Sequence, residues 1–207
     1  MSLLTSKLLA SLNWTEHGFG TRDTNPDQTA MARLQQIHSA AIFVAREPGC
    51  AGEGDALVTR TPGVAVSIRT ADCFPILLAD PETRAVAAIH AGWRGTAAGV
   101  VRTSLDRMRK EFGTDPRNVF AAIGPGIGAC CYEVGLEVAR QFGMAEAGKL
   151  DLAAENRNQL IAAGVQTDWI EQVGGCTFCH PAQFFSWRRD RDRAGRMVSF
   201  IKLIAPP

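Results

Sequence analysis

A pair of apolar runs joined by a short polar turn constrains the fold of this chain more than any other segment. Residues 69–95 read RTADCFPILLADPETRAVAAIHAGWRG, and Asp-Pro-Glu-Thr at 80–83 is typical of a turn between two strands. If residues 80 and 83 close an antiparallel hairpin, the same register places Cys73 directly opposite His90. Opposed residues share a face with Cβ atoms about 4.5–5.5 Å apart, so this thiol and imidazole could bind one metal ion. A slip of one residue would separate them.

Length and composition predict one globular domain that acts on a small partner. The 207 residues contain no Pro/Ser-rich linker, and they are enough for one sizeable core. A net charge of +1 gives no electrostatic basis for binding nucleic acid or a membrane surface. We therefore expect a small-molecule ligand, no nucleic acid, no membrane, and a monomer or weak homodimer.

The cysteines and the N-terminus indicate a cytoplasmic protein. The N-terminal sequence has a short apolar stretch but no signal-peptide pattern, and no run approaches transmembrane length. Six cysteines in such a chain are expected to be reduced thiols, which favours metal binding or catalysis over a disulfide framework.

Hydrophobic periodicity predicts more strands than helices, an α+β arrangement. A helix is expected through Val101, Leu105, Met108 and Phe112, with Thr96 as its N-cap and Gly113 as its end. Two further helices are expected over 134–142 and 152–163. The strands are predicted at 40–45, 56–59, 64–68, 74–79, 85–89, 119–123 and 197–204.

His38 can complete a metal site with Cys73 and His90. Three protein ligands leave a fourth position open, which is the arrangement of a catalytic zinc. The spacing of the three residues forms no compact motif, and a histidine beside an apolar run can equally be a hydrogen-bonded core residue. The residues alone leave both interpretations open.

Two carboxylates lie beside the expected strands. Asp55 in GEGDALVT and Asp72 in TADC could each orient a ligand histidine or transfer a proton. Each could also simply cap a turn. Asp72 is the stronger catalytic candidate because it adjoins Cys73.

Two segments could bind an anion such as phosphate. In GWRGT at 92–96, Arg94 stands between a strand and a helix, although such a tight connection needs its glycines anyway. In FFSWRRD, Arg188 and Arg189 adjoin aromatic rings that could stack on a base. A solvated arginine face is the alternative.

The sequence Cys176-Thr177-Phe178-Cys179-His180 matches the C-x-x-C-H pattern of covalent haem attachment. We reject haem because that chemistry belongs to exported proteins and no export signal is apparent. A second metal site at Cys176, Cys179 and His180 stays open.

Taken in order, several motifs resemble those of the YfiH-like family, also called laccase-domain or multicopper polyphenol oxidoreductases and described as purine nucleoside phosphorylases with adenosine deaminase activity. The resemblance covers nearly the whole chain, and TADC followed by HAGWRG is quite specific. The motifs are HGFGTR, QQIHSA, GDALVT, TADCFPILLAD, AAIHAGWRGT, IGPGIGACCYEV, and CTF followed by FFSWRRD and GRM.

The resemblance implies a fold, a metal and a substrate class. The fold would be two packed mixed β-sheets flanked by helices in α/β/β/α layers. His38, Cys73 and His90 would bind a catalytic zinc, with copper as the alternative metal. The reactions would be phosphorolysis of adenosine, inosine, guanosine and methylthioadenosine, and deamination of adenosine. Asp72 or Asp55 would then move protons, while Arg188, Arg189 or Arg94 would bind phosphate.

Other functions remain open beside this one. A copper-dependent polyphenol oxidase, laccase-like, would use the same His₂Cys ligands, although four histidines are few for a multicopper centre. A thiol hydrolase would use Cys73 as nucleophile and His90 as base. A nucleoside-binding protein without catalysis is the fourth possibility.

The chain departs from the family pattern between Arg22 and His38. These residues are only 16 positions apart, whereas family members usually have a longer stretch there. We therefore expect residues 1–207 to form a single YfiH-like domain that is shortened between residues 22 and 38. If that segment covers the pocket or holds substrate in the family, affinity and specificity, but not the metal ligands, would be affected.

Overall fold

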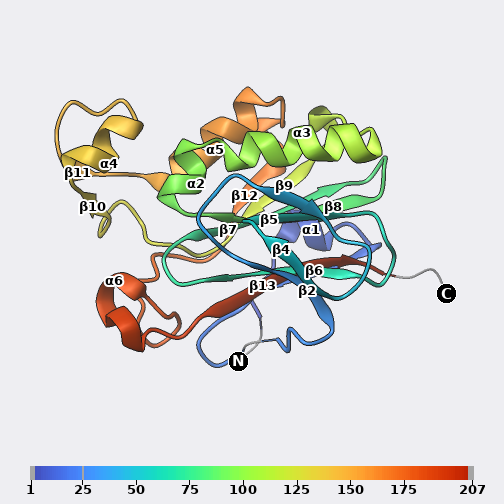
Figure 1. Cartoon of the computed structure of the whole chain (residues 1–207), viewed down its shortest axis with the longest axis horizontal. Coiled ribbons are helices and arrows are strands. Elements are labelled where there is room, and N and C mark those ends of the chain that lie inside the picture. Colours follow the sequence, from blue (N-terminus) through green and yellow to red (C-terminus); the bar gives the residue numbers. More distant parts are fainter. Residues whose placement is uncertain (1–2, 25, 205–207) are drawn as a thin grey trace.

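The predicted hairpin forms the centre of the fold. The computed structural model describes residues 3–24 and 26–204, and β7 (Phe74–Asp80) and β8 (Ala85–Ala91) lie in the middle of a six-stranded mixed sheet (Figure 1). The strand order is β12-β9-β7-β8-β5-β3. The other four strands are β3 (Ile42–Val44), β5 (Ala56–Thr59), β9 (Phe120–Ile123) and β12 (Ile170–Gln172).

The hairpin register differs from the predicted one by two residues. Asp80 pairs with Ala85, so the turn contains four residues, and Pro75 rather than Cys73 lies opposite His90. The direct opposition of Cys73 and His90 was therefore wrong. A shift of two residues preserves the face on which each side chain lies, because side chains alternate with a period of two. The prediction that both residues share a face survives for this reason.

A five-stranded mixed sheet packs against one face of this hairpin. Its order is β1-β13-β6-β2-β4. Alternation along β7 sends Leu77 and Ala79 into the core between the sheets, and Ile76 and Leu78 into the core under the helices. Full burial of each leucine or isoleucine side chain contributes about 1.5–3 kcal/mol. The strands are β1 (Thr15–Phe19), β2 (Met31–Gln35), β4 (Gly49–Glu53), β6 (Ala65–Thr70) and β13 (Met197–Leu203).

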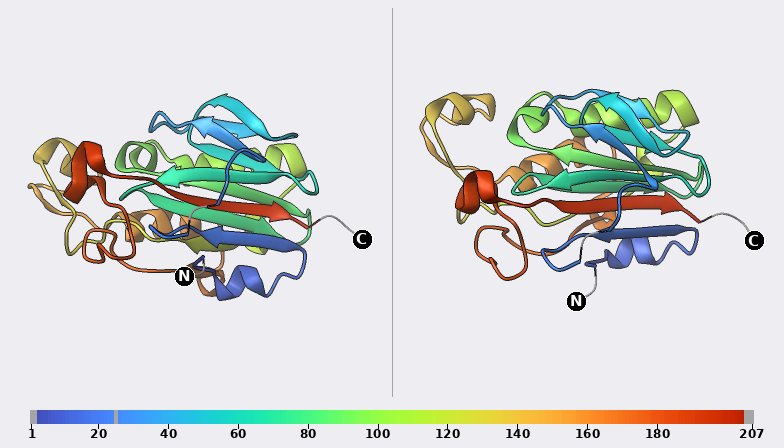
Figure 2. Two further views of the ribbon diagram at one scale, coloured as in Figure 1. Left: turned by 90° about the horizontal axis from the view of Figure 1, so that it is seen from below. Right: turned by 60° about the horizontal axis from the view of Figure 1, so that its bottom comes forward.

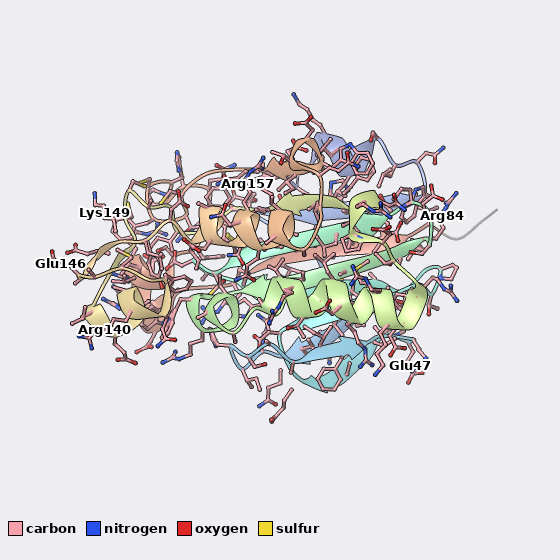
Figure 3. The ribbon with its side chains drawn as sticks, turned by 90° about the horizontal axis from the view of Figure 1, so that it is seen from above. Glu47, Arg84, Arg140, Glu146, Lys149 and Arg157 are labelled. Carbon is pink, nitrogen blue, oxygen red and sulfur yellow. The ribbon has the colours of Figure 1, made fainter. Side chains whose placement is uncertain are left out.

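Three helices cover the outer face of the six-stranded sheet. They are α2 (Trp93–Ala97), α3 (Val100–Phe112) and α5 (Leu152–Ala162), and α3 and α5 run side by side across the sheet (Figure 3). Gly113 ends α3 in a left-handed conformation, as predicted. Thr96 is not the N-cap of this helix. It lies inside α2, where its buried hydroxyl donates to Asn156, and Gly99 precedes α3 instead.

Shorter elements gather around the edges of the two sheets. The helix α1 packs against β1 and β9 (Figure 2). The paired strands β10 and β11, with α4 between them, form a lobe at the same end of the molecule as α6 (Figure 1). These elements are α1 (Lys7–Ala10), β10 (Glu133–Val134), α4 (Leu136–Gln141), β11 (Gly148–Lys149), α6 (Trp187–Asp190), and the 3-10 turns Pro116–Asn118, Thr167–Trp169 and Arg191–Arg193.

The turn of the hairpin and its open end lie at opposite ends of the molecule. The hairpin turn, marked by Arg84, and Glu47 lie at one end, whereas Arg140, Glu146 and Lys149 lie on the lobe at the opposite end (Figure 3). The open end of the hairpin, with Cys73 and His90, therefore faces the lobe. Throughout the described residues, helices long and apolar enough to cross a membrane are absent.

Sequence periodicity identified the buried strands better than the peripheral ones. The seven predicted strands correspond to β3, β5, β6, β7, β8, β9 and β13, with shifts of up to two residues at their ends. The strand β4 was missed because GCAGE has no apolar run, and it is an edge strand with mostly accessible side chains. The α+β class with two packed mixed sheets and flanking helices is confirmed.

We expect buried His17 in β1 to make stability depend on pH. Its Nε2 accepts a hydrogen bond from the Ser6 N–H at 2.9 Å, which requires an unprotonated nitrogen. Burial lowers the pKa of His17, against smaller opposing effects of Glu171 and Ser6. The unfolded chain therefore binds this proton more readily, and acidification through the ordinary histidine pKa of about 6.5 destabilises the fold. In His17→Gln, the loss of unfolding free energy between pH 7.5 and 5.5, measured by urea denaturation, should be smaller than in the wild type.

The control is Glu16→Gln on the same strand. Glu16 is exposed and paired with Lys202, so this change should leave the pH dependence over that interval intact. An unchanged pH dependence in His17→Gln would contradict the assignment.

Candidate metal centre and cavity

Three potential metal ligands converge at the open end of the hairpin. Cys73 immediately precedes β7, His90 lies near the end of β8, and His38 follows β2. One ligand atom from each lies within 4.8 Å of the others. The rings of His38 and His90 meet edge to face, with centroids 4.9 Å apart. The geometry thus brings together the three residues that the sequence singled out.

Strand alternation explains why these side chains meet. His90 has the same parity along β8 as Val86 and Ala88, which face the core between the two sheets. His38 reaches the site from a loop and has a positive φ of 59°. Gly92 leaves the necessary space, because a Cβ atom there would lie 2.9 Å from the Cys73 Sγ and 3.2 Å from the His38 ring.

Asp55 fixes His90 and the loop that carries His38. Its carboxylate is completely buried and lies 2.7 Å from His90 Nδ1. The same carboxylate accepts hydrogen bonds from the backbone N–H groups of Ile37, His38 and Ser39. This leaves Nε2 of His90 available as a ligand atom for a metal. Asp55 does not line the cavity, so it positions ligands and does not face a substrate.

Charge interactions displace the pKa values of this cluster. Burial alone would raise the pKa of Cys73, but the charge of His90 and hydrogen bonds from both histidines lower it to about 6. Burial opposes protonation of His90, but the Cys73 thiolate and Asp55 raise its pKa to about 9. Near neutral pH the cysteine is therefore a thiolate, the form that binds metals, while a metal must displace the His90 proton.

Asp72 lies on the cavity side of the site. Its backbone has a positive φ of 84°, a conformation that is unusual for a residue other than glycine. One carboxylate oxygen accepts a hydrogen bond from the Thr177 hydroxyl and the other from the Arg188 backbone N–H, both at 2.6 Å. It is the one carboxylate among the described residues that line the cavity.

The three ligand candidates open into a cavity of about 610 Å³. Its size suits a small molecule such as a nucleoside. The walls combine cationic and aromatic side chains, and Trp187 is 45% exposed. The arginines are Arg69, Arg94, Arg188 and Arg196, and the aromatic residues are Trp93, Tyr132 and Trp187.

The structure separates the three predicted anion ligands. Arg94 lines the cavity and stacks on Trp93, while Arg188 lines it and stacks on Tyr132. Arg189 does not line the cavity. All five N–H groups of its guanidinium donate to protein acceptors, namely the Asp190 carboxylate and the carbonyls of Thr177, Phe178 and Phe184. Arg189 therefore anchors the loop before α6, and of the three predicted anion ligands the structure places only Arg94 and Arg188 at the cavity.

Sequence reasoning did not select two further cavity residues. Arg69 lies four positions before Cys73, and Tyr132 follows the glycine-rich turn. Arg69 has no usable signal, because it lies on β6 of the five-stranded sheet, and alternation does not continue across the bend to Cys73 and β7 of the other sheet. Tyr132 has none in the strand pattern, because a loop brings it to the cavity.

Comparisons with known proteins agree with this arrangement. Residues 20–204 match the family model described as multi-copper polyphenol oxidoreductase laccase. A purine nucleoside phosphorylase from Deinococcus radiodurans is 44% identical over 182 residues, which cover 83% of this chain and 70% of that protein. The adenosine deaminase RL5 from an unknown prokaryotic organism is 40% identical, over 85% of this chain and 73% of that protein.

A solved structure has the same fold. The hypothetical protein YfiH of Bacillus licheniformis superposes with a TM-score of 0.86 at 27% identity, covering 91% of this chain and 92% of that one. The family match extends over most of the chain and includes every residue of the metal centre. The chain therefore belongs to the YfiH-like family of multi-copper polyphenol oxidoreductase laccase proteins.

Proposed function

We propose that this protein is a zinc-dependent purine nucleoside phosphorylase that acts on adenosine, inosine, guanosine and methylthioadenosine and also deaminates adenosine. The observation that carries the proposal is a three-ligand His₂Cys cluster that opens into a cationic, aromatic cavity. The names of the relatives, purine nucleoside phosphorylase and adenosine deaminase, support the substrate class.

The donor set fits zinc. His38, Cys73 and His90 supply nitrogen and thiolate ligands close enough for one ion, and the cavity side leaves room for a fourth ligand. Zinc in such a site supplies an acidified water molecule near neutral pH. The fit is improved by Asp55, which holds His90 with Nε2 free.

A multicopper centre fits less well. The chain has four histidines, and only His38 and His90 belong to the cluster. His17 bonds to the backbone of Ser6, and the His180 ring lies 2.9 Å from the Cys176 carbonyl. A single copper in the same His₂Cys ligands is the alternative, which metal analysis of the isolated protein distinguishes.

Asp72 is the residue we propose for proton transfer to and from the substrate. It faces the cavity and adjoins Cys73, whereas Asp55 is buried behind His90. Thr177 and the Arg188 N–H hold the Asp72 carboxylate in place. A carboxylate fixed on the wall of this cavity could accept a proton from an attacking group and return it to a nitrogen of the purine.

The arginines are proposed to bind phosphate and the aromatic rings the purine. Guanidinium groups match phosphate oxygens in geometry and charge. Arg188 has five N–H groups, one of which donates to the Glu133 carbonyl at 3.0 Å. Trp93, Tyr132 and Trp187 supply apolar faces on which a base can stack. Phosphate held there would be oriented toward the ribose C1′, and the purine would be the leaving group.

A thiol hydrolase remains the second candidate, on one specific observation. Cys73, His90 and Asp55 stand in the order of a nucleophile, a base and an orienting carboxylate. The extra imidazole of His38 beside the thiol favours a metal instead.

Incubation with adenosine tests the proposed function directly. With phosphate, we expect adenine and ribose 1-phosphate; without phosphate, we expect inosine. Chelation or Cys73→Ser should reduce both activities at least about 100-fold. Loss of a direct metal ligand should reduce activity at least as much as loss of a residue that only orients a ligand. The control is Cys50→Ser, a free exposed cysteine in β4. Unchanged nucleosides in every zinc-loaded sample would refute the proposal, and chelator-resistant activity blocked by alkylation would favour the thiol hydrolase.

Asp55→Asn should weaken metal binding. The amide keeps the shape of the side chain but loses the charge that orients His90 and accepts the backbone N–H groups of the His38 loop. Loss of such an outer partner typically reduces metal affinity about 10–100-fold. Competition with a chromophoric chelator measures this affinity, with circular dichroism to verify folding. A folded variant with wild-type affinity would exclude the positioning role of Asp55.

Arg188→Gln should separate the two reactions. We expect the KM for phosphate in phosphorolysis to rise about 10-fold or more, since a hydrogen bond to a charged group contributes about 1.5–3 kcal/mol. Deamination measured without phosphate should retain its kcat. The matched control is Arg193→Gln, an exposed arginine outside the described lining. Equal losses in both reactions would place Arg188 in general support of the cavity and not in phosphate binding.

A further inference from the structure

A second cluster of thiols lies outside the His₂Cys centre. Cys130 and Cys131 follow the glycine-rich turn, and Cys176 and Cys179 lie in the loop before α6. All four Sγ atoms lie within 4.8 Å of one another. We infer that these four cysteines bind one zinc ion in a closed, structural Cys₄ site, separate from the proposed catalytic metal.

The sulfur separations fit a single ion. Tetrahedral zinc with bonds of about 2.3 Å requires thiolate sulfurs about 3.8 Å apart. Cys179 Sγ lies 3.2 Å from Cys131 Sγ and 3.6 Å from Cys130 Sγ. A disulfide would need about 2.05 Å. An iron–sulfur cluster places several ions between its thiolates and needs a wider arrangement. The spacing Cys176-x-x-Cys179 is also the usual spacing of two zinc ligands on one loop.

The surrounding backbone prepares the cluster for a metal. The Gly128 N–H donates to the Cys176 Sγ at 3.2 Å, the type of outer contact that stabilises a metal-bound thiolate. Thr177 N–H donates to the Gly126 carbonyl at 2.9 Å, which ties the two loops together. A Cβ atom at Gly128 would lie 3.3 Å from both the Cys130 Sγ and the Cys176 Cβ. Glycine at 128 therefore favours the close approach of the loops, because a Cβ atom there would push them a few tenths of an ångström apart.

His180 does not take part, contrary to the metal site considered from the C-x-x-C-H pattern. Its Nδ1 lies 2.9 Å from the Cys176 carbonyl oxygen, so the ring stabilises the loop backbone by a hydrogen bond. Cys130 and Cys131, distant in sequence, complete the four ligands instead. Four protein ligands leave no open position, which indicates a structural and not a catalytic ion.

The position of this site explains what it would stabilise. Tyr132, which lines the cavity, directly follows Cys131. Thr177, whose hydroxyl holds Asp72, directly follows Cys176. One ion bound by both loops would therefore fix an aromatic wall of the cavity relative to its carboxylate.

Metal stoichiometry tests this inference without depending on enzyme activity. Elemental analysis of the purified wild type should give two zinc ions per chain. Cys73→Ser and the double variant Cys130→Ser/Cys179→Ser should each retain one, and the triple variant none, with Cys50→Ser as the control that keeps two. A wild type with a single zinc ion that disappears in Cys73→Ser, with Cys130 and Cys179 free or in disulfides by mass spectrometry, would overturn the Cys₄ site, as would iron in its place.

Cobalt substitution identifies the ligands even if the double variant folds poorly. In the Cys73→Ser background, bound cobalt should have tetrahedral visible bands and the strong near-ultraviolet sulfur charge transfer of a Cys₄ site. The single variant Cys130→Ser should weaken that absorption and accelerate metal loss to a chelator. Cobalt absorption that is unaffected by Cys130→Ser would refute the assignment. Because this measurement omits the first site, it separates failure of the Cys₄ site from failure of the proposed function.

Discussion

The metal centre depends on the hydrogen bonds that the buried Asp55 carboxylate accepts. The carboxylate is completely inaccessible and accepts hydrogen bonds from the His90 ring, the Ser39 hydroxyl and three consecutive backbone N–H groups. A buried charge is stable only when it is fully paired and hydrogen-bonded. These contacts hold the pKa of Asp55 at about 2, although burial alone would raise it. One charge thus fixes both a strand residue and the loop that supplies His38.

Strand pairing on both sides of β8 brings this carboxylate to His90. β5 and β7 flank β8 on opposite sides, so Asp55 and Cys73 approach His90 from two different strands. Backbone pairing continues the register, because the His90 N–H donates to the Asp55 carbonyl at 2.7 Å. The ligand geometry is therefore determined by strand pairing, except for His38, whose position depends on the loop and its positive φ.

Sequence periodicity predicted the parts of the site that lie on strands. The face shared by Cys73 and His90 follows from alternation, which is insensitive to an error of two residues in register. The precise turn was not predictable, because Arg84 adopts a positive φ that its residue type does not favour. His38 was a candidate from the residues alone, but a distant loop residue leaves no periodic signal, so only the family resemblance favoured it as a ligand over a core histidine. The Cys₄ cluster escaped prediction for a related reason: its two halves lie more than 40 residues apart, and only the fold brings them together.

The contrast between Arg188 and Arg189 shows why composition alone cannot assign anion ligands. The two residues are adjacent on α6, so their side chains point about 100° apart around the helix. The Arg188 guanidinium reaches the cavity and stacks on Tyr132, whereas the Arg189 guanidinium donates its hydrogen bonds to backbone carbonyls and to the Asp190 carboxylate. A chain of hydrogen bonds links the two arginines. Arg189 donates to the carbonyls of Thr177 and Phe178. The Thr177 hydroxyl donates to the Asp72 carboxylate, which also accepts a hydrogen bond from the Arg188 backbone N–H. The loop anchored by Arg189 therefore determines where the cavity presents both its carboxylate and its neighbouring guanidinium.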